Sequence, residues 1–474
     1  SVQLDYELGF ATLTVIPGYR YTHARFAVQP SFLYNVGGAY NANGDRTKGE
    51  TSDQYSLEAR IAHETEKLKW VLGAYAFKEE QGTDYALNGG LVLNTRNKMD
   101  LETEAYAGFG QVTYSVTDAV RLTAGLRYTS DKRSASDFQL FAISPMVLGA
   151  APTPFDCVPG NGAPIGSLCS LVNPTPGFYD SSVTSNKLTW KAGVEIDVAP
   201  QSMLFFDVST GFKAGGFNQA VSLTNPSQLQ PFNPEKVTAY TLGLKNRFFD
   251  NKLQLNLEAF YLDYKDMQLS AQAIDGANAI VLLTQNAGKA RISGGSVNVV
   301  FKPWTGGTIR GSAEYIDSEY KEFLIQQLAF FVPPGRVGCP VSAPNAFGLV
   351  TIDCAGQPLV RTPEWAGSVG FNQVFGLANG GDITFDADVA FASSRYLATD
   401  FIAAEKAKGY ANLSASLTYN APDDKWFISA FGRNLTNEEI YTGGGGHQSG
   451  FVTGWVTSNI APPRTYGVRI GAKF

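Results

Sequence analysis

Residues 464–474, which end the chain, alternate strictly between apolar side chains and polar or small ones. In an extended strand, residues two apart lie on the same face. One face of this segment would carry Tyr466, Val468, Ile470, Ala472 and Phe474, and the opposite face Thr465, Gly467, Arg469, Gly471 and Lys473. The first face suits contact with lipid and the second suits contact with water, so the segment predicts the last strand of a membrane-embedded sheet.

The same alternation recurs along the chain, among other places at residues 188–198, 253–261 and 411–419. Between the apolar residues of these segments stand Thr, Lys, Glu, Asp, Asn, Gln and Ser. If both faces of such a strand were dry, these polar groups would be buried without compensation. One face must therefore be wet, and the period of two predicts strands rather than helices.

The hydropathy of the chain fits strands that cross a membrane. No stretch approaches the roughly 18 to 20 uninterrupted apolar residues that a membrane helix requires, and the mean hydropathy is −0.10. A transmembrane β-barrel places apolar residues at every second position, so its average hydropathy resembles that of a soluble protein. We therefore predict an all-β, transmembrane, antiparallel β-barrel. The net charge of −6, with Lys and Arg scattered singly, argues against nucleic acid as a partner.

Short and long connections alternate strictly between the predicted strands. The short ones, supplied with Gly, Pro, Asn or Asp, are predicted to be periplasmic turns, and the long ones extracellular loops. The predicted turns lie at residues 8–9, 64–69, 117–119, 199–202, 250–252, 303–307, 377–382 and 421–425. The predicted loops lie at residues 32–48, 85–97, 138–178, 221–233, 273–278, 326–359, 398–403 and 442–460.

These turns and loops divide the chain into about 17 strands. Many of the strands have about 15 to 20 residues, whereas roughly 9 to 11 are needed to cross lipid. We therefore expect the wall to project beyond the membrane. A closed bacterial barrel has an even number of strands and both ends on the periplasmic side, whereas residue 1 here enters from the outside. No signal peptide precedes the first predicted strand. At least one strand is expected upstream.

The four cysteines fall as two close pairs, Cys157 with Cys169 and Cys339 with Cys354, each within a predicted loop. Both pairs are predicted to form disulfides in an oxidising compartment. Each bond would stabilise the folded state by about 3 kcal/mol, because it lowers the chain entropy of the unfolded state. The Cys-x-x-Cys spacing of a metal site is absent, so no metal site is predicted.

Three segments resemble the TonB-dependent outer-membrane receptor family. The first is Ser-Thr-Gly-Phe-Lys-Ala-Gly-Gly-Phe-Asn at residues 209–218, at the outer end of a predicted strand. The second is Phe-Gly-Arg-Asn-Leu-Thr-Asn-Glu-Glu-Ile-Tyr at residues 431–441, and the third is the terminal segment 463–474. The second segment, placed about 40 residues before a terminal Phe, is the most specific of the three.

The resemblance implies a barrel of about 22 strands that is preceded by a plug domain and a short TonB-contacting box. Residues 1–474 would then be the barrel from about the sixth strand to the last, with the plug, the box and the first strands upstream. It also implies the outer membrane of a Gram-negative bacterium. The implied partners are outer-membrane lipid and lipopolysaccharide, the TonB–ExbB–ExbD machinery, the barrel assembly machinery and a small-molecule ligand. In such proteins the last strand carries an assembly signal, which here would comprise Tyr466, Val468, Ile470 and Phe474.

Candidate ligand contacts lie on the predicted extracellular side. The glycine-rich loop near the end offers aromatic and imidazole groups on an adaptable backbone, and loop packing is the alternative role. Phe217 and Asn218 stand in the first family-like segment, where the double glycine could instead have a structural role. Tyr396 and Phe401 flank a short loop and could instead belong to the aromatic girdle at the membrane surface. The predicted ligand contacts are Phe217, Asn218, Tyr396, Tyr441, His447, Phe451 and Trp455.

No catalytic site and no cofactor are predicted. The histidines His23, His63 and His447 lie far apart in the predicted wall, and no spacing suggests a serine triad. The inward carboxylates could be imagined as acid–base pairs, but a wet lumen lined by alternating polar residues explains them as well. These carboxylates are Glu195, Asp197, Asp386 and Asp388.

The family resemblance predicts active uptake of a scarce nutrient, of which a ferric siderophore is the commonest cargo. Carbohydrate, cobalamin and aromatic compounds are alternative cargoes, and a passive porin of 16 to 18 strands is an alternative function, in roughly the size range of known porins. An outer-membrane enzyme or adhesin would need a hydrolytic residue set or a passenger domain, and neither is found in the sequence. Barrel walls share one alternating pattern whatever they transport, so the sequence does not identify the cargo.

Overall fold

The computed structural model describes residues 1–24, 50–88, 94–143, 153–154, 167–170, 181–218, 231–274, 280–329, 332, 335, 337–346, 348–447 and 456–472. Nearly all of these residues are in strands or in the turns between them, and their only helical elements are short 3-10 turns. No helix in this part of the chain is long and apolar enough to span a membrane. The predicted all-β fold class is confirmed.

Within the described residues, the main sheet contains 20 strands. Three of them, β7 (Thr153–Pro154), β8 (Ser167–Ser170) and β15 (Leu349–Asp353), are short segments within long connections. The other seventeen pair in sequence order, antiparallel throughout, which confirms the predicted count. They are β1 (Leu4–Glu7), β2 (Thr12–Ala24), β3 (Glu50–Glu64), β4 (Leu68–Asn88), β5 (Asn94–Ser115), β6 (Val120–Ile143), β9 (Ser181–Ala199), β10 (Ser202–Lys213), β11 (Glu235–Phe248), β12 (Leu253–Ile274), β13 (Ile280–Phe301), β14 (Gly307–Leu328), β16 (Trp365–Gly376), β17 (Asp382–Ala392), β20 (Tyr410–Asn420), β21 (Trp426–Arg433) and β24 (Thr465–Ala472).

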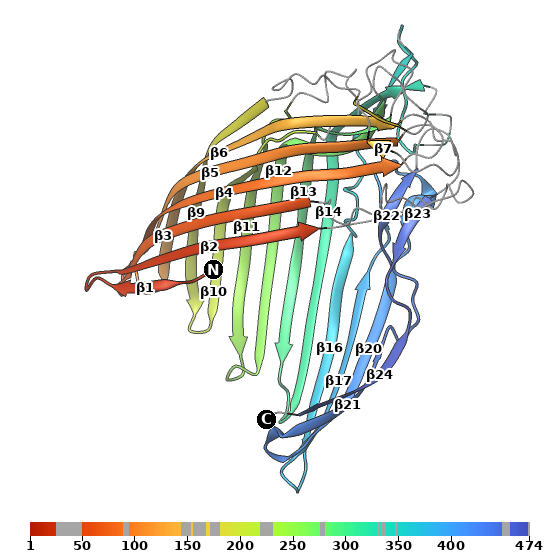
Figure 1. The fold of residues 1–474 in the computed structure, drawn as a ribbon. Coiled ribbons are helices and arrows are strands. Elements are labelled where there is room, and N and C mark those ends of the chain that lie inside the picture. Colours follow the sequence, from red (N-terminus) through yellow and green to blue (C-terminus); the bar gives the residue numbers. More distant parts are fainter. Residues whose placement is uncertain are drawn as a thin grey trace.

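These strands form a strongly curved wall whose two edge strands, β1 and β24, stand apart (Figure 1). Two small hairpins accompany it: β18 (Arg395–Tyr396) with β19 (Lys406–Ala407), and β22 (Tyr441–His447) with β23 (Val456–Ile460). Tight connections lie along one edge of the wall, hereafter the turn edge, and longer connections along the other, hereafter the loop edge. Each of the eight predicted tight turns lies on the turn edge, as expected.

One face of the wall, the apolar face, exposes large hydrophobic side chains at every second residue. Along β6, for example, Leu122, Leu126 and Tyr128 are 48–59% exposed. Aromatic pairs mark two levels of this face: Tyr240 with Tyr261 and Tyr315 with Trp365 toward the loop edge, and Tyr419 with Trp426 at the turn edge. An apolar band between two aromatic girdles is the surface that a transmembrane β-barrel presents to lipid.

The opposite face, the polar face, carries ion pairs that cross between strands. On β6, Arg121 contacts Glu195 at 2.9 Å and Asp197 at 2.6 Å, both on β9. On β14, Arg310 reaches Asp386 and Asp388 of β17, each at 3.3 Å. The carboxylates that the sequence placed on the wet face therefore have arginine partners.

The bridge from Arg310 crosses the strand that lies between its two ends. Gly370 of β16 is in register with Arg310 on one side and with Asp388 on the other. A Cβ atom at this position would lie 2.4 Å from the Asp388 carboxylate and 3.1 Å from the Arg310 guanidinium. The missing side chain therefore leaves the space through which the two charged groups meet.

The strands differ greatly in length. β6 has 24 residues and β12, β13 and β14 have 22 each, whereas β21 and β24 have 8 each. Since roughly 9 to 11 residues suffice to cross lipid, the long strands extend well past an apolar band of that height. Most of the large buried side chains gather at the loop edge of the long strands β12–β14, rather than in the middle of the wall.

Candidate functional site

Residues 214–218, hereafter the strap, follow β10 at the loop edge and contact β12 and β13. Gly216 pairs with Phe232 through two backbone hydrogen bonds of 2.9 and 3.1 Å. A Cβ atom at Gly215 would lie 2.4 Å from the Phe232 carbonyl oxygen. The double glycine therefore permits the close approach of the two backbones.

Two polar side chains hold the strap against the sheet. The Asn218 side chain is 8% exposed; its amide donates to the Thr284 carbonyl at 2.9 Å, and its oxygen accepts from the Thr284 N–H at 2.6 Å. Gln268, on β12, donates to the carbonyls of Ala214 and Asn233 at 2.9 and 3.1 Å. Phe217 lies half-buried between the strap glycines and Asn218. Ligand contact by Phe217 and Asn218 stays a prediction.

The connection from β14 to β16 forms a compact layer at the loop edge, hereafter the disulfide cap, defined as residues 337–346 and 348–364. Cys339 and Cys354 are bonded, as predicted, and both are buried. Within the cap, β15 pairs with the outer end of β14, from Leu324 with Asp353 to Leu328 with Leu349. The other predicted pair is not tested, because Cys157 lies outside the described residues.

An aromatic core lies under the disulfide cap. Tyr320 and Phe323 of β14 are 2% and 0% exposed, with ring centroids 4.8 Å apart. Phe401 is 3% exposed, and its ring meets theirs edge-on at 6.3 and 6.5 Å. Burial raises the pKa of Tyr320, because the phenolate form would lose its hydration.

The structure corrects one sequence-based alternative. A girdle residue must face lipid, but Phe401 is buried in the cap core, so the girdle interpretation of Phe401 is wrong. Tyr396, on β18, is half-buried beside it, with ring centroids 5.3 Å apart. The Lys406 ammonium lies 5.4 Å from the Tyr396 ring centroid, which is cation–π distance.

Tyr441, at the start of the β22–β23 hairpin, is joined to the β18–β19 hairpin. The Arg395 guanidinium donates to its carbonyl oxygen at 2.7 Å. Its hydroxyl donates to the Glu439 carboxylate at 2.8 Å, and this hydrogen bond raises the pKa of Tyr441. His447 ends β22 in register with Val456. Phe451 and Trp455 lie outside the described residues.

The second family-like segment forms a tight turn at residues 434–438, hereafter the asparagine turn. Asn434 has φ +50°, and its side chain donates to the carbonyls of Glu438 and Pro462 and accepts from the Glu438 N–H. Asn is one of the few residues that adopt this left-handed conformation readily. Thr436 donates to the Ala411 carbonyl at 3.0 Å, which ties the turn to β20.

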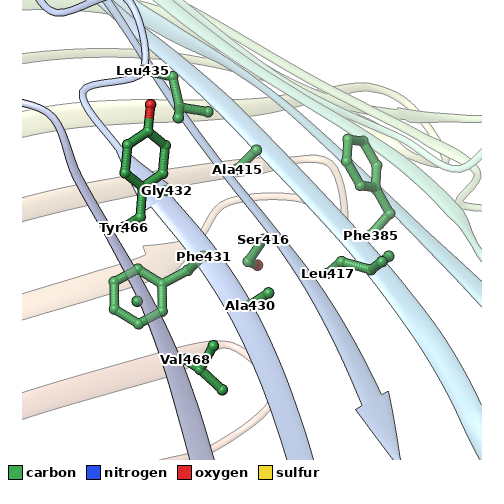
Figure 2. Close-up of a pocket in the computed structure, with 11 residues that line it drawn as sticks. Phe385, Ala415, Ser416, Leu417, Ala430, Phe431, Gly432, Leu435, Tyr466 and Val468 are labelled. Carbon is green, nitrogen blue, oxygen red and sulfur yellow. The ribbon is translucent and has the colours of Figure 1, made fainter.

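A groove of about 560 Å³, hereafter the lateral groove, lies on the apolar face over β17, β20, β21 and β24 (Figure 2). Its floor consists of small residues, namely Ala415, Ala430 and Gly432. Its sides are Phe385 and Leu417 at one end and Leu435, Tyr466 and Val468 at the other. Three residues of the predicted assembly signal are strongly exposed: Tyr466 by 70%, Val468 by 67% and Ile470 by 72%. Phe474 lies outside the described residues.

Sequence reasoning missed the cap core and Gln268. A usable signal was present in the aromatic residues Tyr320 and Phe323, which fall in a segment otherwise rich in charge. Among the described residues, no group of three or more His, Cys, Asp or Glu side chains is placed to hold a metal ion. The described residues thus form a curved wall with an apolar face and a polar face, and a compact layer covers the loop edge of β12–β14.

A family model described as TonB dependent receptor-like, beta-barrel matches residues 1–435. The ferric yersiniabactin uptake receptor FyuA from Yersinia pestis is 17% identical, with a TM-score of 0.69 over 98% of this chain and 59% of its own. The siderophore receptor PiuA from Acinetobacter baumannii is 14% identical, with a TM-score of 0.63 over 99% of this chain and 63% of its own. The copper transporter OprC is 14% identical, with a TM-score of 0.60 over 97% and 63%. The chain thus spans about six tenths of the length of these proteins, and at such identities the likeness shows the fold alone.

Proposed function

This chain belongs to the TonB-dependent receptor β-barrel family of the outer membrane, and we propose that it is the wall of a receptor for active uptake of a scarce nutrient. Members of this family are transporters that work with TonB–ExbB–ExbD and bind small ligands. The observation that carries the proposal is the family match over residues 1–435. In this assignment the apolar face contacts lipid, the polar face lines the lumen, and the loop edge is extracellular.

The proposed cargo is a ferric siderophore. Of the structurally similar proteins, one is named as a ferric yersiniabactin uptake receptor, one as a siderophore receptor and one as a copper transporter. The proposed contacts are the aromatic and polar side chains at the extracellular edge that the sequence singled out: Phe217, Asn218, Tyr396, Tyr441, His447, Phe451 and Trp455. Of these, Tyr396 packs against Phe401 within its own hairpin, and Tyr441 accepts a hydrogen bond from Arg395 of the neighbouring hairpin. These contacts support a preorganised binding surface.

We further propose that the seventeen paired strands are the sixth to the last of a barrel of about 22 strands. A plug domain and a TonB-contacting segment would precede them in the whole protein. The share of the related structures that this chain covers, about six tenths, supports this placement.

The proposal is tested by transport in a Gram-negative strain that lacks its own siderophore receptors. Cells expressing the full-length receptor should accumulate radioactive iron from at least one of three ferric siderophores, a hydroxamate, a catecholate and a carboxylate. Uptake should stop when tonB is deleted. If the cells instead take up cobalamin or an oligosaccharide in a TonB-dependent way, the proposed cargo is wrong and the proposed TonB-dependent uptake stands.

A passive porin predicts a different electrical result. The purified full-length receptor should leave a planar bilayer nearly non-conducting, because a plug would close the lumen. Steady conductance by the full-length protein, together with uptake that does not need TonB, would overturn the proposal.

A further inference from the structure

The aromatic core under the disulfide cap lies on the luminal side of the wall. Tyr320 and Arg310 are an even number of residues apart on β14, so they share a face of the strand. Arg310 belongs to the polar face, which lines the lumen in the proposed assignment. Tyr410, at the start of β20, is opposite Ala392, which shares the face of Asp388. Both tyrosines therefore stand on the face that a cargo would meet.

Phe401 fixes the connection between β17 and β20 to the disulfide cap. Its ring lies edge-on to Tyr396 and to the two core rings of β14, with centroids 5.3 to 6.5 Å apart. In the cap, the Gly338 N–H donates to the Asp400 carbonyl at 2.7 Å. A side chain at Gly338 would overlap the Phe401 carbonyl oxygen, so this close approach requires glycine.

A second junction lies where the cap returns to the wall. The Arg361 N–H donates to the Tyr396 carbonyl at 2.7 Å, and the Arg361 guanidinium donates to the Leu397 carbonyl at 3.4 Å. Arg361 has φ +61° and Phe401 has φ +53°. Bulky residues avoid this left-handed region because it costs free energy. The contacts between the cap and the β18–β19 hairpin therefore impose both conformations.

Arg395 joins this hairpin to the β22–β23 hairpin. Its Nη2 atom donates to the Tyr441 carbonyl at 2.7 Å, and its guanidinium lies 5.8 Å from the Tyr410 ring centroid. Its Nη1 atom is buried and has no hydrogen-bond partner among the described residues. A buried donor without a partner costs free energy. Local costs of this kind persist where the surrounding structure imposes them, and they cluster at ligand sites.

We propose that Arg395 is a positioning residue for the cargo: it holds Tyr441 in place relative to the β18–β19 hairpin, and the disulfide cap holds that hairpin through Phe401. The inference rests on the proposed function, in which Tyr396 and Tyr441 contact the cargo. Loss of a link leaves both tyrosines present but lets the two hairpins move apart. A site that must be ordered on binding loses affinity. The links therefore set how tightly the cargo binds and not how fast bound cargo is transported.

The test uses the full-length receptor in cells, with the ferric hydroxamate, catecholate and carboxylate of the transport assay as probes. Binding of each radioactive complex is titrated in a strain without tonB, and the maximum uptake rate is measured in a strain with tonB. Arg395→Gln should weaken binding about tenfold, as expected for one lost hydrogen bond from a charged group. The maximum uptake rate should not change. Arg395→Lys keeps a charged donor and should recover part of the affinity.

A matched arginine acts as the control. Arg464 is exposed at the same edge and donates to the Leu435 carbonyl at 3.4 Å, so its bond goes to the asparagine turn instead. Arg464→Gln should bind the probes as the unaltered receptor does.

The link from the cap is tested by replacing Cys339 and Cys354 with Ser. This change should weaken binding at least about twofold. Adding Arg395→Gln to it should weaken binding no further than Arg395→Gln does alone, because both changes act through one chain of contacts. If the serine variant does not reach the membrane, Phe401→Leu carries the same expectation.

The proposal is wrong if Arg395→Gln loses no more affinity than Arg464→Gln. A lower maximum uptake rate with unchanged affinity would also overturn it, because Arg395 would then act in the transport step. Additive losses in the combined variant would overturn the link from the cap. An unaltered receptor that binds none of the three probes would contradict the proposed cargo and this role together, whereas failure of the role alone appears only in the variants.

Discussion

The wall is completed at its extracellular edge by different means in two regions. Over β12–β14, whose strands have 22 residues each, the outer ends lie beneath the disulfide cap and its aromatic core. Over β20, β21 and β24, which have 8 to 11 residues, the chain leaves β21 through the asparagine turn, which side-chain hydrogen bonds hold. The outer ends of the long strands are thus covered by an apolar core, whereas the outer end of β21 is held by a turn that satisfies backbone groups.

This comparison predicts that the cap is sensitive to the loss of buried volume. Phe323→Ala should destabilise the cap by about 3 to 5 kcal/mol, because a fully buried ring is removed. Hydrogen exchange should show the amides of β15 exchanging at least roughly a hundredfold faster, with the amides of residues 434–438 unchanged. Tyr315→Ala, on the apolar face of the same strand, is the control and should leave β15 protected. Equal exchange in both variants would break the comparison.

The disulfide should contribute the next largest amount. Replacing Cys339 and Cys354 with Ser should destabilise the cap by about 3 kcal/mol, from a bridge with a sequence separation of 15. Limited proteolysis should then cleave within residues 337–364. Reduction of the unaltered protein should give the same cleavage pattern. A variant that resists proteolysis as well as the oxidised protein would mean that the core alone holds the cap.

The asparagine turn should respond to polar changes instead. Asn434→Ala should destabilise it by about 2 kcal/mol, since it leaves the Glu438 N–H without its acceptor and forces Ala into a left-handed conformation. Asn434→Gly relieves only the backbone strain, so it should recover part of the loss. The hydrogen-exchange rate of the Glu438 amide measures the effect of both substitutions. If glycine restores the full protection, backbone conformation and not hydrogen bonding holds the turn.

Of the two regions compared, the cap should show a pH dependence in alkaline solution and the asparagine turn should not. Burial raises the pKa of Tyr320 above its ordinary value of 10.0. When the cap unfolds locally, Tyr320 is exposed and loses its proton above pH 10.0, whereas in the folded cap it stays protonated. The free energy of unfolding of the cap therefore falls as the pH rises from 10.0 toward the raised pKa. The exchange rate of β15 amides, corrected for intrinsic rates, should show this change, and Tyr320→Phe should abolish it. A similar change in the asparagine turn would contradict the assignment.

The alternating pattern was sufficient to predict the wall but not the cap. Strict alternation puts Tyr320 and Phe323 on opposite faces, because they are three residues apart. The structure brings them together because the register shifts between Lys289 and Ala290, where Lys321 becomes an extra residue in β14. A bulge depends on the partner strand, so the pattern of one strand does not reveal it.

In the candidate site too, some features were predictable from the sequence and others depend on contacts between distant segments. The sequence marked residues 209–218 and 431–441 as family-like, and the structure gives parts of both a mechanical role: Asn218 holds the strap and Asn434 holds the turn. The disulfide between Cys339 and Cys354 was predictable from spacing and loop composition. The burial of Phe401 was not, because it depends on contacts with β14 that are distant in sequence.

The bridge from Arg310 across Gly370 to Asp388 joins two strands that share no backbone hydrogen bonds, since β16 lies between them. Both side chains are nearly half exposed, so water screens the charges and the contact contributes at most about 1 kcal/mol. The backbone ladders of β14, β16 and β17 therefore hold the perimeter of the wall at this level, and the bridge decides which charges stand opposite one another on the polar face.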